Sequence, residues 1–355
     1  MRILIVGCGD VGLRAARRLR GRARVYGLTR SPERAAALRA AGVVPVIGDL
    51  DDRASLARLT GLADAVLHFA PPPAEGNADP RTQRLIAALA RASLARRSGG
   101  HGLTVHGRQP LRVEMDTRTG HERSPHPPPP SRTRARGASR SAVPIFTVRG
   151  YVYRHGNKEL RPHTVVYIST SGVYGDCGGE RVAETRPVRP HNDRAKRRVD
   201  AERRLRIWAG RSGRRITLLR APGIYAQDRM PEARVRQGLP ALMPAEDIYT
   251  NHIHAEDLAR LAVIALFRGR PNRVYNAVDD SGLKMGDWFD VVADHLGLPR
   301  PPRQTRAEVM AAVTPAMRTF LSESRRLTNA RIKQELRYRL LYPTVREGLT
   351  AAAPG

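Results

Sequence analysis

The stretch RILIVGCGDVG (2–12) determines how the rest of this sequence is interpreted. A short apolar run, typical of a buried strand, leads directly into three glycines spaced G-x-G-x-x-G and then into a helical pattern. In that setting the first glycine permits a tight turn, the second lets a diphosphate approach the backbone, and the third allows helix and strand to pack closely. The alternative is a glycine-rich turn without a ligand. The residues expected to contact a dinucleotide here are Gly7, Gly9, Asp10, Val11 and Gly12.

Strand and helix signals alternate outward from this turn. Further strand-like runs lie at residues 24–28, 43–48, 65–70, 163–171, 215–220 and 273–278. Helical patterns lie at residues 80–95, 193–208, 253–267, 285–297 and 323–336, the last of which we expect to be the final helix. Such alternation predicts a parallel sheet with helices on both faces. We therefore predict an α/β fold, a Rossmann-type doubly wound parallel sheet with a smaller C-terminal α/β lobe.

The alternation also suggests how the chain is divided. Residues 1–97 and 163–225 are expected to form the dinucleotide-binding domain, and residues 226–350 a substrate-binding lobe partly interleaved with it. Residues 98–162 contain HPPPP, SRTRARGASRS and little periodicity, so we interpret them as a mostly disordered, Arg/Pro-rich insertion. A reading-frame slip in the gene is an alternative that the sequence leaves open.

The charge of the chain invites a nucleic-acid interpretation, which we do not favour. The formal net charge is +29, and all but four of the 62 basic residues are arginine. These charges are spread over every segment, and aromatic residues make up only 5% of the chain, so platforms for base stacking are scarce. We therefore expect no specific nucleic-acid partner.

The cellular compartment and the metal content are predicted from sequence features that the chain lacks. No apolar run approaches the ~20 residues that span a bilayer, so we expect no membrane association. The only cysteines are Cys8 and Cys177, which form neither a disulfide framework nor a metal-ligand spacing, and we treat both as inert small residues. Within residues 98–162, His101, His106, His121 and His126 also lack the spacing of a zinc site. We therefore expect a cytoplasmic protein without a metal.

Residues after the predicted strands indicate the type of cofactor. The stretch GLTRSPER (27–34) has Arg30 between two hydroxyl residues, where an NAD site usually has an acid. Arginine suits a 2′-phosphate, so NADP is favoured as the cofactor, with NAD as the alternative. Arg30 could also be one more surface arginine without a ligand. The further positions expected to contact cofactor, each at the end of a predicted strand, are Asp49, Leu50, Ala70, Pro222 and Gly223. Asp49 also suits a turn without a ligand.

Several motifs taken together resemble one known superfamily. GCGDVG, VIGDL, YISTSGVYGD, IHAEDLA and YNAVDD are similar to the extended short-chain dehydrogenases/reductases, in their NAD-dependent epimerase/dehydratase branch. The resemblance covers nearly all of the chain outside residues 98–162, and it is strongest to atypical members with G-x-G-x-x-G. It implies an oxidoreductase or epimerase/dehydratase that acts on a carbonyl/hydroxyl or sugar-nucleotide-like small molecule. It also implies a possible homodimer, because relatives in this superfamily associate through a face made of two helices.

The resemblance carries over unevenly to the catalytic positions. It implies that Thr170, four residues before the tyrosine of V-Y-G, bonds the substrate oxygen. The superfamily's Y-x-x-x-K helix, aligned on Glu202, places Arg194 at the tyrosine position and Arg198 at the lysine position. Arg198 still suits a ribose or phosphate, but an arginine keeps its proton below about pH 12. Arg194 therefore cannot replace the tyrosine in proton transfer.

Other side chains are candidates for the missing proton donor. Tyr174 is the first, with a packing tyrosine at a strand end as its alternative, and Tyr225 is the second. His191 and Asp193 are further candidates, although His191 also suits an exposed turn. If none of them acts, the chain is a non-catalytic protein that senses NADP(H).

One further element is expected to be structural. His254 and Asp257 resemble the superfamily's H-x-x-D-x-A element, which braces the interface between the two lobes. We therefore expect these two residues to stabilise the fold.

Overall fold

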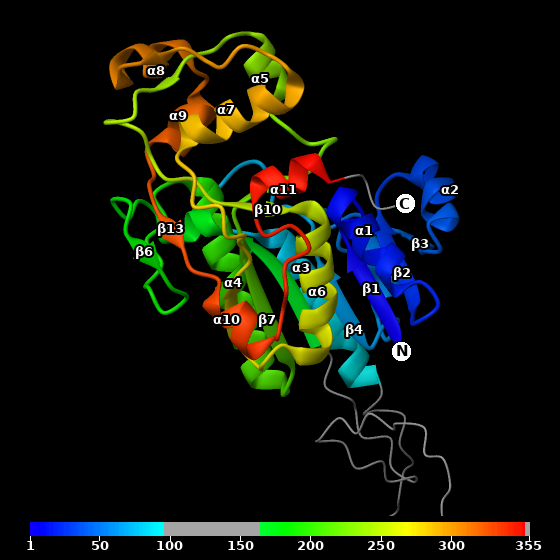
Figure 1. Ribbon diagram of the computed structural model, residues 1–355. Coiled ribbons are helices and arrows are strands. Elements are labelled where there is room, and N and C mark those ends of the chain that lie inside the picture. Colours follow the sequence, from blue (N-terminus) through cyan, green and yellow to red (C-terminus); the bar gives the residue numbers. More distant parts are fainter. Residues whose placement is uncertain (96–163, 352–355) are drawn as a thin grey trace, which may run out of the picture. The chain divides into compact units, whose positions relative to one another are not determined.

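The computed structural model describes residues 1–95 and 164–351 (Figure 1). All of these residues belong to one compact unit. The expectations for residues 98–162 lie outside the described residues. Within the described part of the chain, no helix is both long enough and apolar enough to cross a lipid bilayer.

A seven-stranded parallel sheet forms the centre of this unit, which confirms the predicted fold class. Its strands are β1 (Arg2–Val6), β2 (Arg24–Thr29), β3 (Val44–Ile47), β4 (Ala65–His68), β5 (Thr164–Thr170), β7 (Arg215–Ala221) and β11 (Arg273–Asn276). Their order is β11-β7-β5-β4-β1-β2-β3, so the winding direction reverses between β1 and β4. Ligands of such sheets bind at the carboxyl ends of the strands beside that reversal.

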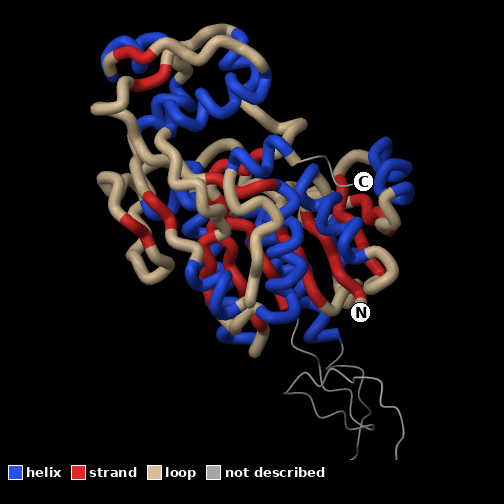
Figure 2. The backbone as a smooth tube through the Cα atoms, viewed as in Figure 1, coloured by secondary structure: helices blue, strands red, loops and turns tan. Residues whose placement is uncertain are grey.

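Helices cover both faces of the sheet because side chains alternate along its strands. Ile3 and Ile5 of β1 face α1 (Asp10–Leu19) and α6 (Ala255–Arg268), whereas Leu4 and Val6 face the opposite layer. That opposite layer consists of α3 (Pro80–Ala95) and α4 (Asp193–Ser212). Figure 2 shows the strands running beside one another with helices packed against them. Each fully buried Ile or Leu contributes about 1.5–3 kcal/mol.

The C-terminal part of the chain is interleaved with these layers. Both β11 and α6 belong to the main sheet and its cover, although they lie within the range predicted for the lobe. A separate apolar cluster gathers around Trp288 and Phe289. Its elements include α5 (Glu232–Arg236), β9 (Ala241–Leu242), α7 (Met285–Leu296), α8 (Arg306–Ala312), α9 (Pro315–Leu321) and α11 (Val345–Thr350). The strand β12 (Arg303–Gln304) pairs with β9.

The prediction of a final helix over residues 323–336 is wrong. Glu323 and Arg325 are buried and pair with each other at 2.7 Å, so this segment is extended where a helix was expected. It continues into β13 (Arg326–Leu327), which pairs with β6 (Arg181–Val182), and the helix α10 covers only Ala330–Glu335. The true last helix is α11. The remaining short elements are η1 (Pro32–Arg34), α2 (Ala35–Ala40), η2 (Ser55–Leu59), η3 (Ser171–Tyr174), β8 (Gly223–Tyr225) and β10 (His252–His254).

Candidate functional site

Two glycines of the turn after β1 are required by close packing. Gly7 has φ +94°, and a Cβ atom there would lie 2.5 Å from the backbone nitrogen of Ala70. Ala70 is held in that place because its N–H donates to the Val6 carbonyl at 2.9 Å. A Cβ atom on Gly12 would lie 2.4 Å from the Gly7 oxygen. The turn, the start of α1 and the end of β4 therefore fit together only with glycine at positions 7 and 12.

Gly9 is different, because packing does not require it. It is exposed, its φ is −76°, and a Cβ atom there would meet nothing within 4 Å. It is the N-cap of α1 and makes no side-chain cap bond, so the first backbone N–H groups of the helix lack intrahelical acceptors. Helix N-termini with free N–H groups attract anions, and phosphates in particular. The open space at Gly9 therefore fits a diphosphate.

The other predicted residues of this turn are engaged on either side of the opening. Val11 is buried in the apolar layer between the sheet and the helices α1 and α6. The Asp10 carboxylate is half-buried and accepts a hydrogen bond from Arg14 Nε at 2.6 Å. The Asp10 carboxylate therefore forms an ion pair with Arg14 on α1. The opening at Gly9 is then lined by the backbone N–H groups at the start of α1.

The end of β2 presents two arginines beside the turn. Arg30 is exposed, as expected, and the turn that carries it is closed by a hydrogen bond from Ser31 N to Thr29 Oγ1 at 3.2 Å. Arg34, which no sequence motif singles out, donates from Nη2 to the Cys8 carbonyl at 2.9 Å. Its position four residues after Arg30 was the available signal. The arginine fixed directly against the glycine turn is therefore Arg34.

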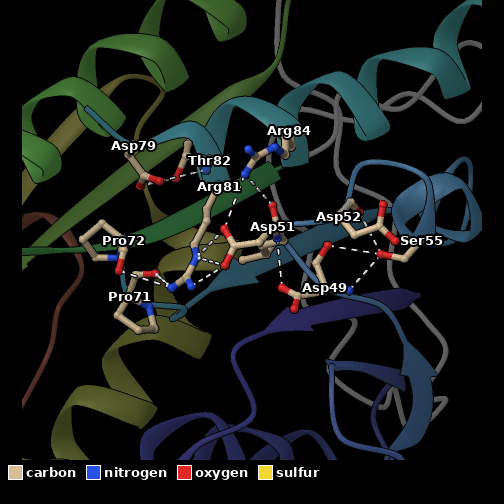
Figure 3. A network of polar contacts seen from close by, with 11 residues as sticks. Asp49, Asp51, Asp52, Ser55, Pro71, Pro72, Asp79, Arg81, Thr82 and Arg84 are labelled. Carbon is tan, nitrogen blue, oxygen red and sulfur yellow. Dashed lines mark hydrogen bonds and ion pairs between the residues drawn. The ribbon is translucent and has the colours of Figure 1, made fainter. Parts of the chain in front are cut away.

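Asp49 lies in a turn stabilised by its own side chain (Figure 3). Its Oδ1 accepts from the Asp51 N–H at 2.9 Å, and its N–H donates to Ser55 Oγ at 2.9 Å. Leu50 is buried, and its carbonyl accepts from Arg84 at 3.1 Å. The aspartate is thus a turn residue, as its alternative interpretation stated, and its second carboxylate oxygen makes none of these contacts.

Arg81 connects this turn to the loop after β4 (Figure 3). Its Nε lies 3.0 Å from both carboxylate oxygens of Asp51, and its Nη1 donates to the carbonyls of Pro71 and Pro72 at 3.3 Å. The hydrogen bond from Arg81 holds the pKa of Asp51 below its usual range, and the positive charge of Arg30 adds to this effect. The network therefore fixes the loops after β3 and β4 relative to each other.

Thr170 lies under the first turn of α4. It is the last residue of β5, it is 8% exposed, and its Oγ1 accepts from the Gly172 N–H at 3.3 Å. A Cβ atom on Gly172 would lie 3.7 Å from Thr170 Oγ1 and 3.9 Å from the Cβ of Ala195 in α4. The structure therefore brings the threonine and the start of α4 together.

Pro222 and Gly223 lie at the same edge of the sheet. They directly follow Ala221, which is the register partner of Thr170. Gly223 is exposed, and its N–H donates to the Asn251 carbonyl at 3.1 Å.

The two arginines of α4 have different surroundings. Arg198 Nη1 donates to the Tyr167 hydroxyl at 3.0 Å and to the Ile168 carbonyl at 2.8 Å. The Arg194 guanidinium lies over the Phe320 ring, with its carbon 5.2 Å from the ring centre. Among the described residues, Arg194 has no hydrogen-bond or ion-pair partner. Arg198 is therefore anchored to β5, and Arg194 is not anchored by any polar contact there.

Tyr174 does not fit the role of proton donor that was expected for it. It is 1% exposed, and its hydroxyl donates to Asn276 Oδ1 at 2.7 Å. Its ring lies 4.7 Å from the guanidinium carbon of Arg220, which forms a buried pair with Glu202 at 2.7 Å. Burial raises the pKa of the phenol. Tyr174 thus packs between strands with its hydroxyl already hydrogen-bonded, which favours the alternative interpretation of a packing tyrosine.

Tyr225 is also committed to packing. Its hydroxyl donates to the Thr344 carbonyl at 3.2 Å, and a Cβ atom on Gly348 would lie 2.4 Å from that hydroxyl oxygen. Burial raises its pKa far above the ordinary value. His191, by contrast, is exposed, and its ring lies 3.3 Å from where a Cβ atom of Gly175 would be. Asp193 is exposed and pairs with Lys196 at 3.0 Å.

The H-x-x-D element has the bracing contacts that were expected. His254 Nδ1 accepts from the Glu256 N–H at 3.2 Å and caps α6. The Asp257 carboxylate is buried and accepts from the Tyr338 hydroxyl and from the N–H groups of Leu341 and Tyr342, at 2.7 to 2.9 Å. These bonds hold the C-terminal segment against α6. Within the described residues, no group of three or more His, Cys, Asp or Glu side chains could hold a metal ion.

Comparisons with protein families agree with this arrangement. The model of the TrkA-N domain matches residues 3–93, and that of the NAD dependent epimerase/dehydratase family matches residues 152–277. This chain has the epimerase/dehydratase fold. The resemblance inferred from the sequence motifs is thus confirmed. A comparison with curated protein sequences finds no match.

Solved structures with the epimerase/dehydratase fold match over nearly the whole chain. A functionally unknown conserved protein from Silicibacter pomeroyi is 25% identical, with a TM-score of 0.65, over 98% of this chain and 96% of that chain. The UDP-glucose 4-epimerase of Thermotoga maritima, solved with UDP-glucose, is 15% identical with a TM-score of 0.64 and the same coverage. The UDP-glucose 4-epimerase of Thermus thermophilus, solved with NAD, is 19% identical with a TM-score of 0.62, also over 98% and 96%.

Proposed function

We propose that this protein is a nicotinamide-dependent oxidoreductase or epimerase/dehydratase that acts on a carbonyl/hydroxyl or sugar-nucleotide-like substrate. The observation that carries the proposal is the open, uncapped N-terminus of α1 at Gly9, beside the point where the strand order reverses. The structures of similar fold that contain NAD or UDP-glucose support the same ligand class.

The chain's own residues would hold such a cofactor along the carboxyl edge of the sheet. The N–H groups at the start of α1 would bind the diphosphate, and the turn of Asp49 and Leu50 would lie at the adenine end. Ala70 would lie at the nicotinamide end, with Pro222 and Gly223 beside it. Arg198, anchored on β5, retains donors beyond its Nη1 for a ribose hydroxyl.

We propose NADP as the preferred cofactor because two arginines flank the end of β2. Arg34 is held against the glycine turn, and Arg30 is exposed beside it, so both suit a 2′-phosphate. The double variant R30Q/R34Q should weaken NADPH binding by at least about tenfold and leave NADH binding within about threefold. R17Q/R39Q removes the same charge from exposed positions of α1 and α2 and serves as the control. Equal losses of affinity for NADPH and NADH would show that the two arginines do not recognise the 2′-phosphate.

The nicotinamide ring supplies or accepts the hydride when the cofactor is bound. The Thr170 hydroxyl would hydrogen-bond the reacting oxygen of the substrate. Neither Tyr174 nor Tyr225 is free to transfer a proton, and a guanidinium keeps its own. The proton that the oxygen gains or loses would therefore be exchanged with water or with the exposed His191.

Turnover against a panel of carbonyl compounds and sugar nucleotides tests the proposed reaction. The wild type should turn over at least one class with NADPH or NADP, and Thr170→Ala should lower kcat/KM by about 10²-fold, the scale of a lost transition-state hydrogen bond. Thr350→Ala removes a threonine hydroxyl from an exposed end of α11 and should leave kcat/KM unchanged. Turnover that is unaffected by Thr170→Ala would refute the proposed site.

One observation favours a second function, that of a non-catalytic NADP(H) sensor. The positions expected for the tyrosine and lysine hold Arg194 and Arg198, and both substitute tyrosines are buried with partners. A sensor would bind NADPH with the same dependence on Arg30 and Arg34 but would turn over no member of the panel. The two experiments together distinguish the functions, because one measures binding and the other measures chemistry.

A further inference from the structure

Positive charge is concentrated around the first turns of α4. The charges of Arg198, Arg197 and Arg325 all act on Arg194, and Glu323 is the carboxylate that opposes them. Arg325 is itself buried, and its Nε has no hydrogen-bond partner among the described residues. The cluster Arg194, Arg197, Arg198, Arg325 and Glu323 thus has more cations than carboxylates.

Glu323 is already occupied by other groups. Its Oε2 accepts from Arg325 Nη1 at 2.7 Å, and its Oε1 accepts from Asn192 Nδ2 at 3.2 Å. Arg325 Nη1 also donates to the Gly175 carbonyl at 2.7 Å. The carboxylate therefore neutralises Arg325 and braces the start of α4, and the described contacts of its two oxygens do not include Arg194.

Within residues 1–95 and 164–351, the remaining arginines of the cluster also have hydrogen-bond partners, except for Arg194. Arg197 donates to the Gly76 carbonyl, and Arg198 donates to β5. Arg194 has only the ring of Phe320 beneath it, an aromatic residue that is 46% exposed. An aromatic face orients a guanidinium and leaves its N–H groups available to another ligand.

The electrostatics of this position favour an added anion. Arg194 is exposed as a residue, but partial desolvation of its guanidinium lowers its pKa, and the neighbouring positive charges of Arg198, Arg197 and Arg325 lower it further, whereas Glu323 opposes the shift. An oxyanion beside Arg194 would relieve this repulsion, and a guanidinium binds a carboxylate or phosphate through two parallel hydrogen bonds.

We infer that Arg194, oriented by Phe320 and left without a polar partner, recognises a carboxylate or phosphate group on the substrate. The inference rests on the proposed function, since Thr170 lies under the same turn of α4. The substrate class is thereby narrowed to anionic carbonyl or hydroxyl compounds whose charged group lies near the reacting carbon.

Binding of small anions tests the inference directly. Malonate and inorganic phosphate serve as probes, each titrated at constant ionic strength into the protein with and without saturating NADPH, and thermal unfolding is followed. At least one probe should raise the melting temperature of the wild type in a saturable way. R194Q should weaken that probe's apparent affinity by at least about tenfold. R194K should weaken it less, because lysine keeps the positive charge but cannot donate two parallel hydrogen bonds to the anion.

The control is Arg206→Gln, which removes an exposed arginine of the same helix and should leave the affinity unchanged. A malonate response without a phosphate response assigns a carboxylate, and the reverse assigns a phosphate. Equal responses of R194Q, R206Q and the wild type, or the lack of any saturable response, would overturn the inference. NADPH binding is scored separately, so a protein that responds to anions through Arg194 but does not bind NADPH would refute the proposed function alone.

Discussion

The two halves of the sheet's carboxyl edge differ in how much of their surface is left to a ligand. At the half formed by β1 and β2, backbone N–H groups and exposed arginines surround an open turn at Gly9. At the half formed by β5, β7 and β11, Tyr174 and its neighbours are buried and paired. Diphosphate binding depends mainly on backbone geometry, whereas proton transfer depends on particular side chains. The half formed by β1 and β2 can therefore keep its capacity to bind a dinucleotide even when the catalytic side chains of the other half are replaced.

The largest effect is expected in the paired half, from Glu202→Ala. The carboxylate of Glu202 binds Arg220 through two hydrogen bonds of 3.1 and 2.7 Å and connects α4 to β7. Its removal leaves a buried guanidinium without a counter-charge, so the free energy of unfolding in urea should fall by about 3–5 kcal/mol. Glu232→Ala, which breaks an exposed pair with Arg236, should change it by no more than about 0.5 kcal/mol. Similar values for the two variants would mean that the buried pair does not hold α4.

The next effect is expected in the open half, from Gly7→Ala. The added methyl group would overlap the backbone of Ala70 in a turn with φ +94°, so stability should fall by about 2–4 kcal/mol. Gly9→Ala adds the same methyl group where nothing lies within 4 Å, and it should cost no more than about 1 kcal/mol, the scale of a poorer N-cap residue. Urea unfolding of the two variants measures the contrast, and equal losses would contradict the distinction between a packed and an open glycine.

A smaller effect concerns pH and the residue Asp279, which lies beyond the end of β11. It accepts from the Ser281 N–H at 3.0 Å, and burial raises its pKa to about 8. Because the folded state then holds a proton that the unfolded state loses near pH 4, this carboxyl stabilises the fold at low pH and loses that contribution as pH rises through 8. Buried His68, His252 and His254 have lowered pKa values, so they act in the opposite direction below about pH 6.5.

Unfolding in urea between pH 6.5 and 8 isolates the contribution of Asp279. The free energy of unfolding should fall by about 1.5 kcal/mol over this interval in the wild type, and it should be nearly flat in Asp279→Asn. An equally steep decline in the variant would assign the pH dependence to another group.

The smallest effect is expected from Tyr174→Phe. The phenol donates one buried hydrogen bond to Asn276, so its loss should cost about 1 kcal/mol of stability. If the protein turns over a substrate, kcat should stay within about twofold of the wild type, because the hydroxyl is not available for proton transfer. A fall of about 10²-fold in kcat with intact folding would restore Tyr174 as the proton donor.

The central sheet could be predicted because local sequence determines it. Each of its strands is an apolar run that ends at turn residues, and the glycine spacing after β1 encodes both the turn and the start of α1. The pairing of β6 with β13 joins Val182 to Leu327, and no local pattern signals such a contact. The apparent helix at residues 323–336 was misleading for a related reason, since Glu323 and Arg325 are buried by an ion pair and not by a helical face.

The candidate site was predictable only in part. Positions 170, 194 and 198 follow from motif spacing, and the structure brings Thr170 under the first turn of α4. The burial of Tyr174 could not be inferred, because its partner Asn276 lies 102 residues away in the sequence. The role of Phe320 beside Arg194 also arises only in three dimensions.

The central claim is that a dinucleotide diphosphate binds at the open turn of Gly9, and titration of NADPH fluorescence tests it most directly. The wild type should bind NADPH with a submillimolar Kd. Gly9→Val, whose side chain would extend into the open space, should bind at least about tenfold more weakly, and urea unfolding of the variant verifies that it is folded. Equal affinity of the two proteins, or no binding by the wild type, would contradict the account.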